Sequence, residues 1–132
     1  MVIDTSALLA ILLQEQDARS FAEAIERDPV RLISAGTILE ASIVLLARHG
    51  EAGVRDLDLL LHRIDARIEP ATAEQMEFGR EAFARYGKGR HPAGLNYGDC
   101  FSYALSAATG EPLLFKGDDF GRTDLRAALQ PT

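Results

Sequence analysis

Short strand-like runs alternate with longer helical runs along this chain, and this alternation limits the folds that it can adopt. Brief apolar runs predict strands over residues 2–3, 30–35, 66–70 and 112–115. Helical runs are predicted over residues 6–13, 17–27, 37–48, 53–64 and 73–86, with a last one past Gly98. Strands joined by helical crossovers form a mostly parallel sheet with helices on both faces. The sequence therefore predicts an α/β protein in three layers, α/β/α.

Length and composition indicate one globular domain. A chain of 132 residues can bury a proper core but is too short for two ordinary domains, so we expect a single domain over residues 1–132. Its 47% hydrophobic and 26% charged residues are typical of soluble proteins rather than of disordered or membrane proteins. The apolar run at 7–13 is too short to cross a bilayer and follows no basic leader. We expect a cytoplasmic protein without membrane contact.

Cysteine, histidine and net charge exclude several kinds of site. The single cysteine, Cys100, rules out an internal disulfide. His49, His62 and His91 lie too far apart in sequence to resemble a zinc site. A formal net charge of −6 argues against broad electrostatic wrapping of nucleic acid, although it leaves room for a local basic strip.

The stretch "LNYGDCFSYALSAATG" places an acid at the entrance of an amphipathic helix. The apolar positions expected on its buried face are Phe101, Ala104, Leu105 and Ala108. Asn96 can cap this helix, and Asp99 lies in its first turn, where a carboxylate meets free backbone N–H groups. Capping and metal binding both remain open as the role of Asp99.

Other acids are expected at the same edge of the sheet. In parallel α/β sheets the ligand site lies beyond the carboxyl ends of the strands. Asp4 follows the first strand, Glu40 lies in the first turn of the helix after the second strand, and Asp118 and Asp119 follow the last strand. Together with Asp99, these positions predict a cluster of carboxylates at one rim.

Each of these acids also has a structural interpretation. Asp4 can cap the next helix, and "TILE" has the pattern of a capping box with Thr37 at the N-cap and Glu40 three residues later. Asp118 and Asp119 follow Gly117 and can be ordinary turn residues. Their joint placement is more specific than any one of them.

A cluster of carboxylates at neutral pH requires a cation. Like charges within a few ångströms repel and raise one another's pKa values, which a divalent ion relieves. Oxygen ligands without sulfur or imidazole suit Mg²⁺ or Mn²⁺. Such ions serve phosphoryl chemistry by activating water and stabilising the leaving oxygen.

Basic residues are available for a phosphate-bearing substrate. Lys88, Arg90 and His91 lie in the loop "GKGRHPAGLN" before the Asp99 helix, and Lys116 stands beside the last acids. These side chains could hold phosphates, although a solvated loop with scattered positive charge is an equal alternative.

In chain order, the motifs "VIDTSAL", "LEAS", "LNYGDCFSYALS" and "PLLFKGDDF" resemble those of the PIN-domain ribonucleases, in particular the VapC-type toxins of type II toxin–antitoxin pairs. The similarity spans nearly the whole chain. It implies a compact α/β/α fold and a Mg²⁺-dependent endoribonuclease, in which Mn²⁺ can substitute. Asp4, Glu40 and Asp99 would form the acidic core.

The resemblance also assigns further roles. An acid directly before phenylalanine matches the family pattern, which favours Asp119 as the fourth acid and leaves Asp118 as the alternative. Ser6 would support Asp4 or a metal-bound water. With the basic residues named above from the sequence itself, the expected substrate contacts are Ser6, Lys88, Arg90 and Lys116. The implied partners are RNA and a cognate antitoxin. Apolar residues in the first two and the fourth predicted helices favour a homodimer. We expect this homodimer to form part of a larger toxin–antitoxin assembly.

Three other functions can be compared with this one, and the sequence lacks an aspartate that two of them need. A phosphorelay receiver needs an aspartate after its middle strand, and the second and third strands here end in "SAG" and "IEP". A haloacid-dehalogenase-type phosphatase needs an aspartate two residues after Asp4, where this chain has Ser6. The third alternative is a non-catalytic or housekeeping PIN-like nucleic-acid-binding domain, in which the acids only cap helices.

Overall fold

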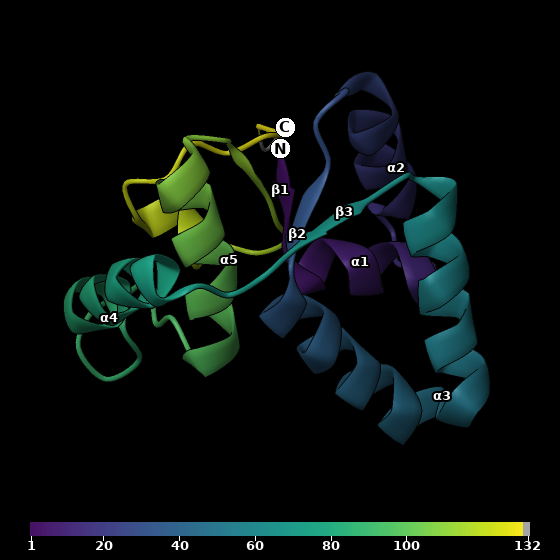
Figure 1. Ribbon diagram of the computed structural model, residues 1–132, viewed down its shortest axis with the longest axis horizontal. Coiled ribbons are helices and arrows are strands. Elements are labelled where there is room, and N and C mark those ends of the chain that lie inside the picture. Colours follow the sequence, from purple (N-terminus) through teal and green to yellow (C-terminus); the bar gives the residue numbers. More distant parts are fainter. Residues whose placement is uncertain (131–132) are drawn as a thin grey trace.

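A parallel sheet forms the centre of the computed structural model, which describes residues 1–130 (Figure 1). Its strands, in the described part of the chain, are β1 (Val2–Ile3), β2 (Leu32–Ser34), β3 (Arg67–Glu69) and β4 (Leu113–Leu114). Their order in the sheet is β3-β2-β1-β4, and every neighbouring pair is parallel. The predicted parallel sheet is confirmed, with β1 in an interior position.

Helices cover both faces of this sheet. The described helices are α1 (Thr5–Leu12), α2 (Ala18–Arg27), α3 (Ala35–Arg63), α4 (Ala73–Tyr86), α5 (Tyr97–Thr109) and the short 3₁₀ helix η1 (Phe120–Arg122). In Figure 1, α1, α2 and α3 lie on one side of the strands, and α4 and α5 lie on the other. The three-layer α/β/α prediction is therefore confirmed. Within residues 1–130, no helix is both long and apolar enough to span a membrane.

Each face of the sheet has its own hydrophobic core, because successive strand residues point to opposite faces. Ile3 and Leu114 pack with α1, α2 and α3 residues, whereas their neighbours Val2 and Leu113 pack with residues of α4, α5 and η1. All four side chains are fully buried. Both cores thus hold β1 in place, and Asp4 follows directly after it.

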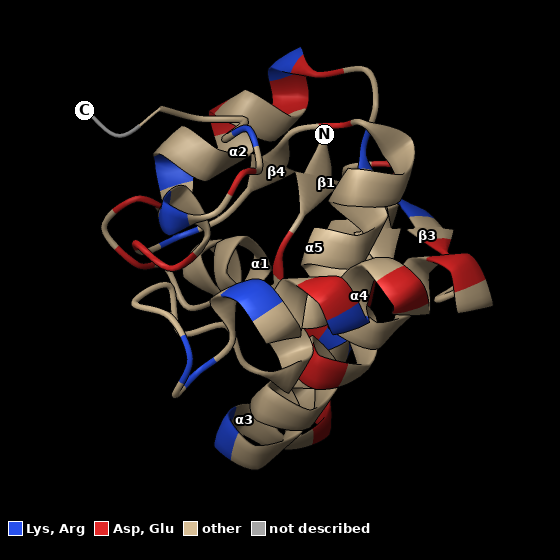
Figure 2. Ribbon diagram, turned by 90° about the vertical axis from the view of Figure 1, so that its left-hand side faces the viewer, with Lys and Arg blue, Asp and Glu red and all other residues tan. Residues whose placement is uncertain are grey.

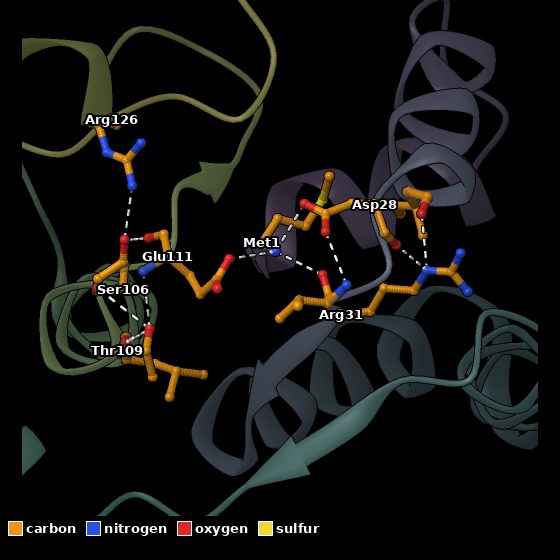
Figure 3. Close-up of polar contacts among 11 residues, drawn as sticks. Met1, Asp28, Arg31, Ser106, Thr109, Glu111 and Arg126 are labelled. Atoms are coloured by element: carbon orange, nitrogen blue, oxygen red, sulfur yellow. Dashed lines mark hydrogen bonds and ion pairs between the residues drawn. The ribbon is translucent and has the colours of Figure 1, made fainter.

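The first strand is also anchored at its start by polar contacts (Figure 3). The Met1 ammonium donates to Asp28 Oδ2 at 3.0 Å, to the Val30 carbonyl at 2.6 Å and to Glu111 Oε2 at 3.0 Å. Burial opposes ionisation of Asp28, but the Val30 N–H, the Met1 ammonium and Arg31 together lower its pKa. These contacts join the start of β1 to the segments that precede β2 and β4.

Helix α5 buries a more polar face than its sequence predicted. Ala104 and Leu105 are buried as expected, but Phe101 is half-buried and Ala108 is exposed. Ala108 lies in the last turn, where Thr109 and Gly110 are exposed as well, so the core does not extend to this end of the helix. Serine and tyrosine side chains complete the buried face, namely Ser102, Tyr103 and Ser106.

Large apolar side chains remain exposed on α3 and α4 rather than on α1 and α2. In the described chain they include Leu39, Ile43, Leu46 and Leu59 of α3, and Met76 and Phe83 of α4. The sequence predicted apolar surfaces on the first two helices and on the helix at 53–64. Of these three, only the helix at 53–64 has a large exposed apolar side chain, Leu59. The apolar residues of α1 and α2 instead fill the core.

The two helices predicted at 37–48 and 53–64 are both present, and the label α3 covers them together with the kink between them. Helix α3 is interrupted at Gly50, whose φ of 64° and ψ of −156° are not helical. This region of backbone space is accessible almost only to glycine. Gly50 therefore separates the two helical segments and turns the chain between them.

We predict that Gly50→Ala lowers the free energy of unfolding by about 1–3 kcal/mol, because alanine is strained in this backbone conformation. Apart from its chain neighbours and the adjoining helix backbone, no described atom lies within 4 Å of the position that the new methyl would take, so the loss would come from the backbone alone. Urea unfolding measures it. Gly121→Ala is the control, because that glycine also faces open space and has no positive φ. Equal stabilities of the two variants would contradict the prediction.

Candidate functional site

Asp4 is a buried carboxylate at the carboxyl end of β1. It caps α1, because its Oδ2 accepts from the Ser6 backbone N–H at 3.0 Å and from Ser6 Oγ at 2.7 Å. Its Oδ1 accepts from Ser102 Oγ of α5 at 2.5 Å. In Figure 2, the acidic segment after β1 lies inside the fold beside α1 and α5. Only 3% of Asp4 is exposed, so these donors replace most of its solvation.

Asp99 both caps α5 and lies among other acids. Its backbone N–H donates to Asn96 Oδ1, and its own Oδ2 accepts from the Asn96 N–H, each at 2.9 Å. The predicted capping role is confirmed. Burial, followed by the charges of Asp4, Asp119 and Glu40, raises the pKa of Asp99 to about 7, against the Asn96 hydrogen bond, which lowers it. Asp99 is therefore close enough to the other three acids to be affected by their charges.

Glu40 reaches across to α1 and α5 and does not cap its own helix. Its Oε1 accepts from Thr5 Oγ1 at 2.5 Å. The rest of the carboxylate lies against Gly98, where a methyl group would overlap it. The predicted Thr37–Glu40 capping box is wrong, because α3 begins earlier, with Ser34 as its N-cap and Thr37 buried inside the helix. Glu40 is thereby left for contacts with other elements.

The last two acids lie in an exposed turn after β4. Asp119 directly precedes η1 and is among the groups whose charge raises the pKa of Asp99, which favours it over Asp118. In residues 1–130, no group of three or more Asp, Glu, His or Cys side chains forms a ready-made metal cluster. Mg²⁺ keeps several waters and is commonly bound through only one or two carboxylates. The donor set therefore fits a hydrated hard cation.

Ser6 and Lys116 join the loop after β4 to Asp4. Ser6 Oγ donates to Asp4 and accepts from the Lys116 backbone N–H at 2.9 Å. The Lys116 ammonium lies 2.7 Å from Glu15 Oε2 and 3.4 Å from Asp17 Oδ1. The hydrogen bond to Glu15 is the largest cause that raises the pKa of Lys116. The Lys116 side chain is thus held at the α1–α2 connection, while its backbone supports the acids.

The two ends of the predicted basic loop are joined by a hydrogen bond, and its cationic side chains are exposed. The Lys88 N–H donates to the Leu95 carbonyl at 2.8 Å, which closes the loop. His91 is structural, since its Nδ1 accepts from the Ala93 N–H at 3.0 Å and its ring packs edge-on against Tyr86. The Lys88 and Arg90 side chains are exposed, in the loop between α4 and α5. His49 and His62 are exposed on α3.

Several residues that shape the site were missed in the sequence. Thr5, Thr37 and Ser102 supply hydroxyl groups to the acids or to one another, and Gly98 gives room to Glu40. The only sequence pattern that could have indicated these residues is a weak one, the spacing of a hydroxyl residue three positions from an acid. Thr37 precedes Glu40 by three residues and Ser102 follows Asp99 by three, so each shares a helix face with an acid.

We predict that Asp99 makes the metal-free protein less stable as the pH rises. Its pKa is about 7 in the folded protein against an ordinary value of 3.8, so folding favours the protonated form. The stability that Asp99 contributes is fully present below its ordinary pKa of 3.8. It is lost as the pH rises through the pKa of about 7 that Asp99 has in the folded protein. Asp99→Asn removes this titration and retains an oxygen for the Asn96 N–H.

Urea unfolding in chelator at about pH 5 and about pH 8 measures the difference. The free energy of unfolding should fall more over this interval in the wild type than in Asp99→Asn. An equal fall in both proteins would show that Asp99 does not carry the effect.

Comparisons with known proteins agree with this geometry. The PIN domain family model matches residues 1–125. Ribonuclease VapC of Mycolicibacterium smegmatis is 55% identical over 127 residues, which cover 96% of this chain and 98% of the relative. Ribonuclease VapC30 of Mycobacterium tuberculosis is 53% identical over 131 residues, which cover 99% of this chain and 100% of the relative.

A solved structure also shares the fold. The crystal structure of Mycobacterium tuberculosis VapC20, described as a sarcin–ricin loop cleaving toxin, matches with a TM-score of 0.78 over 98% of each chain. Its sequence identity is 20%, so this likeness concerns the fold alone. The family match and the two full-length relatives go further and confirm the resemblance seen in the motifs. The chain belongs to the PIN-domain family, among the VapC ribonucleases.

Proposed function

We propose that this protein is a metal-dependent endoribonuclease and the toxin of a toxin–antitoxin pair. The observation that carries the proposal is the placement of Asp99: burial, followed by the charges of Asp4, Asp119 and Glu40, raises its pKa to about 7. A fold that brings like charges together in this way fits a site for a divalent cation. Relatives named VapC ribonuclease, aligned over nearly the whole chain, support the reaction class.

We assign metal binding and catalysis to Asp4, Glu40, Asp99 and Asp119, with Mg²⁺ as the ion and Mn²⁺ as a substitute. A bound divalent cation activates water and stabilises the leaving oxygen of a phosphodiester. The chain's own residues hold the carboxylates in place: Ser6 and Ser102 donate to Asp4, and Thr5 donates to Glu40.

We assign RNA binding to the exposed cations Lys88 and Arg90 and to Lys116. Lys88 and Arg90 are free to meet phosphates, whereas the Lys116 ammonium first has to leave Glu15 and Asp17. Ser6 lies between Asp4 and the loop that carries Asp119, which suits contact with the attacked phosphate or its water. With a net charge of −6, we expect local rather than extended contact with RNA.

Two exposed apolar grooves are candidate binding surfaces for protein partners. A groove of about 550 Å³ between α4 and α5 is lined by Met76, Phe83, Tyr97 and Phe101, among others. A second, of about 530 Å³, is lined by α3 side chains that include Leu39 and Ile43. We assign these apolar surfaces to a cognate antitoxin and to a second copy of the chain.

We also propose that residues 1–132 form one domain that acts in the cytoplasm, where its RNA is. The described C-terminal segment supports a single domain. Phe120 of η1 packs in the core on the α5 side, and Leu129 packs against the other core.

We predict that Asp99→Asn and Asp119→Asn each lower RNA cleavage by more than about a hundredfold, because each removes a negative oxygen from the metal site. Cleavage of a labelled RNA with Mg²⁺ measures the rate. Asp118→Asn is the matched control, since it removes the same charge one residue away and should retain activity. Cleavage that persists after exhaustive chelation would refute metal dependence, and loss in Asp118→Asn alone would reverse the choice of fourth acid.

Arg90→Ala should weaken binding to different RNAs by a similar factor and reduce the salt dependence of binding. The reason is that an exposed arginine in this loop contacts phosphate, which carries no sequence information. Fluorescence anisotropy with the inactive Asp99→Asn protein at several salt concentrations measures both quantities. Arg63→Ala, on the exposed end of α3, serves as a charge control. A loss confined to one RNA sequence would instead identify Arg90 as a base-reading residue.

A further inference from the structure

Two buried hydroxyl groups form a directed chain behind Asp4. Ser102 Oγ donates to Asp4 Oδ1 at 2.5 Å and lies 3.2 Å from Thr37 Oγ1. Both hydroxyl residues are fully buried. A hydroxyl has a single hydrogen to donate, and that of Ser102 is committed to Asp4, so Thr37 must be the donor in the second contact. The chain therefore runs from Thr37 to Ser102 to Asp4.

Ordinary helix chemistry does not account for this arrangement. Hydroxyl side chains within helices often bond to the carbonyl four residues earlier, as Ser42 does to Ile38 and Thr109 does to Leu105 here. Ser102 instead contacts a residue 98 positions away in the chain. Its hydrogen bond is thus given to the buried carboxylate and not to its own helix.

The same contact relates the two helices that present the other acids. Thr37 and Glu40 are three residues apart on α3, and Asp99 and Ser102 are three residues apart on α5. Residues at this spacing share a helix face. A hydroxyl contact between Thr37 and Ser102 therefore sets the position of Glu40 relative to Asp99.

We propose that Ser102 and Thr37 are positioning residues that hold Asp4, and the helices bearing Glu40 and Asp99, in the arrangement that binds a divalent cation. This inference rests on the proposed metal-dependent function. Ser6 holds one Asp4 oxygen and Ser102 holds the other, so the carboxylate cannot rotate freely. Groups that orient metal ligands from behind typically change metal affinity by 10–100-fold.

Calorimetric titration with Mn²⁺ tests the proposal without relying on activity. Ser102→Ala should bind Mn²⁺ about 10–100-fold more weakly than the wild type, because Asp4 Oδ1 loses its donor. Thr37→Val, which keeps the shape and removes the hydroxyl, should show a smaller loss. Thr37→Ser restores a hydroxyl and should bind Mn²⁺ like the wild type.

Ser106→Ala is the matched control on the same helix. Ser106 is also buried, but its hydroxyl donates to the Glu111 carbonyl at 2.6 Å and not to a carboxylate (Figure 3). This variant should lose stability in urea, as Ser102→Ala does, and retain wild-type affinity for Mn²⁺. A merely structural role for Ser102 would make the two variants alike in both measurements.

The outcomes separate the two proposals. Wild-type affinity for Mn²⁺ in Ser102→Ala, or an equal loss in Ser106→Ala, overturns the positioning role and leaves the metal-dependent function intact. Should Ser102→Ala fail to fold, the pair Thr37→Val and Thr37→Ser decides, and equal affinities in that pair overturn the inference. A wild type that binds no Mn²⁺ overturns the proposed function and this inference with it.

Discussion

The buried carboxylate of Asp4 is the constraint around which the rest of the structure is arranged. A charge with 3% exposure is costly unless hydrogen bonds replace its water. The donors come from Ser6 at the start of α1 and Ser102 in α5, on opposite sides of β1. Burial of Asp4 therefore requires both helices to approach the same end of one strand, and the hydrophobic cores on the two faces hold them there.

Electrostatic repulsion is built into the same place. Asp99 lies where burial and three other acids favour its protonated form, and the capping hydrogen bond from Asn96 only partly opposes this effect. A folded chain without cation thus carries a local cost that its two cores must offset. The arrangement makes sense when a cation is bound, because a positive charge converts the repulsion into ligation.

Local sequence patterns predicted the parts of the site that depend on local geometry. The strand ends that carry Asp4 and Asp119 and the capping pair Asn96–Asp99 could be recognised within a few residues. Contacts across the fold were not accessible. Thr37 was assigned as a cap because "TILE" fits the motif, yet Ser34 takes that role and leaves Thr37 to meet Ser102, 65 residues away. Likewise, nothing near Lys116 in sequence shows that Glu15 and Asp17 hold its ammonium.

The pairing of an acid with a hydroxyl on each of two helices explains why this site tolerates short strands. Strands of two or three residues offer few ladder hydrogen bonds to define how α3 and α5 lie against them. A shift of one residue moves a helix by about 1.5 Å along its axis and turns its face by about 100°. Such a shift would break the Thr37–Ser102 contact and leave Asp4 Oδ1 without its donor. Burial of Asp4 thus penalises any register that would also separate Glu40 from Asp99, so one polar network defines both the packing of the helices and the geometry of the acids.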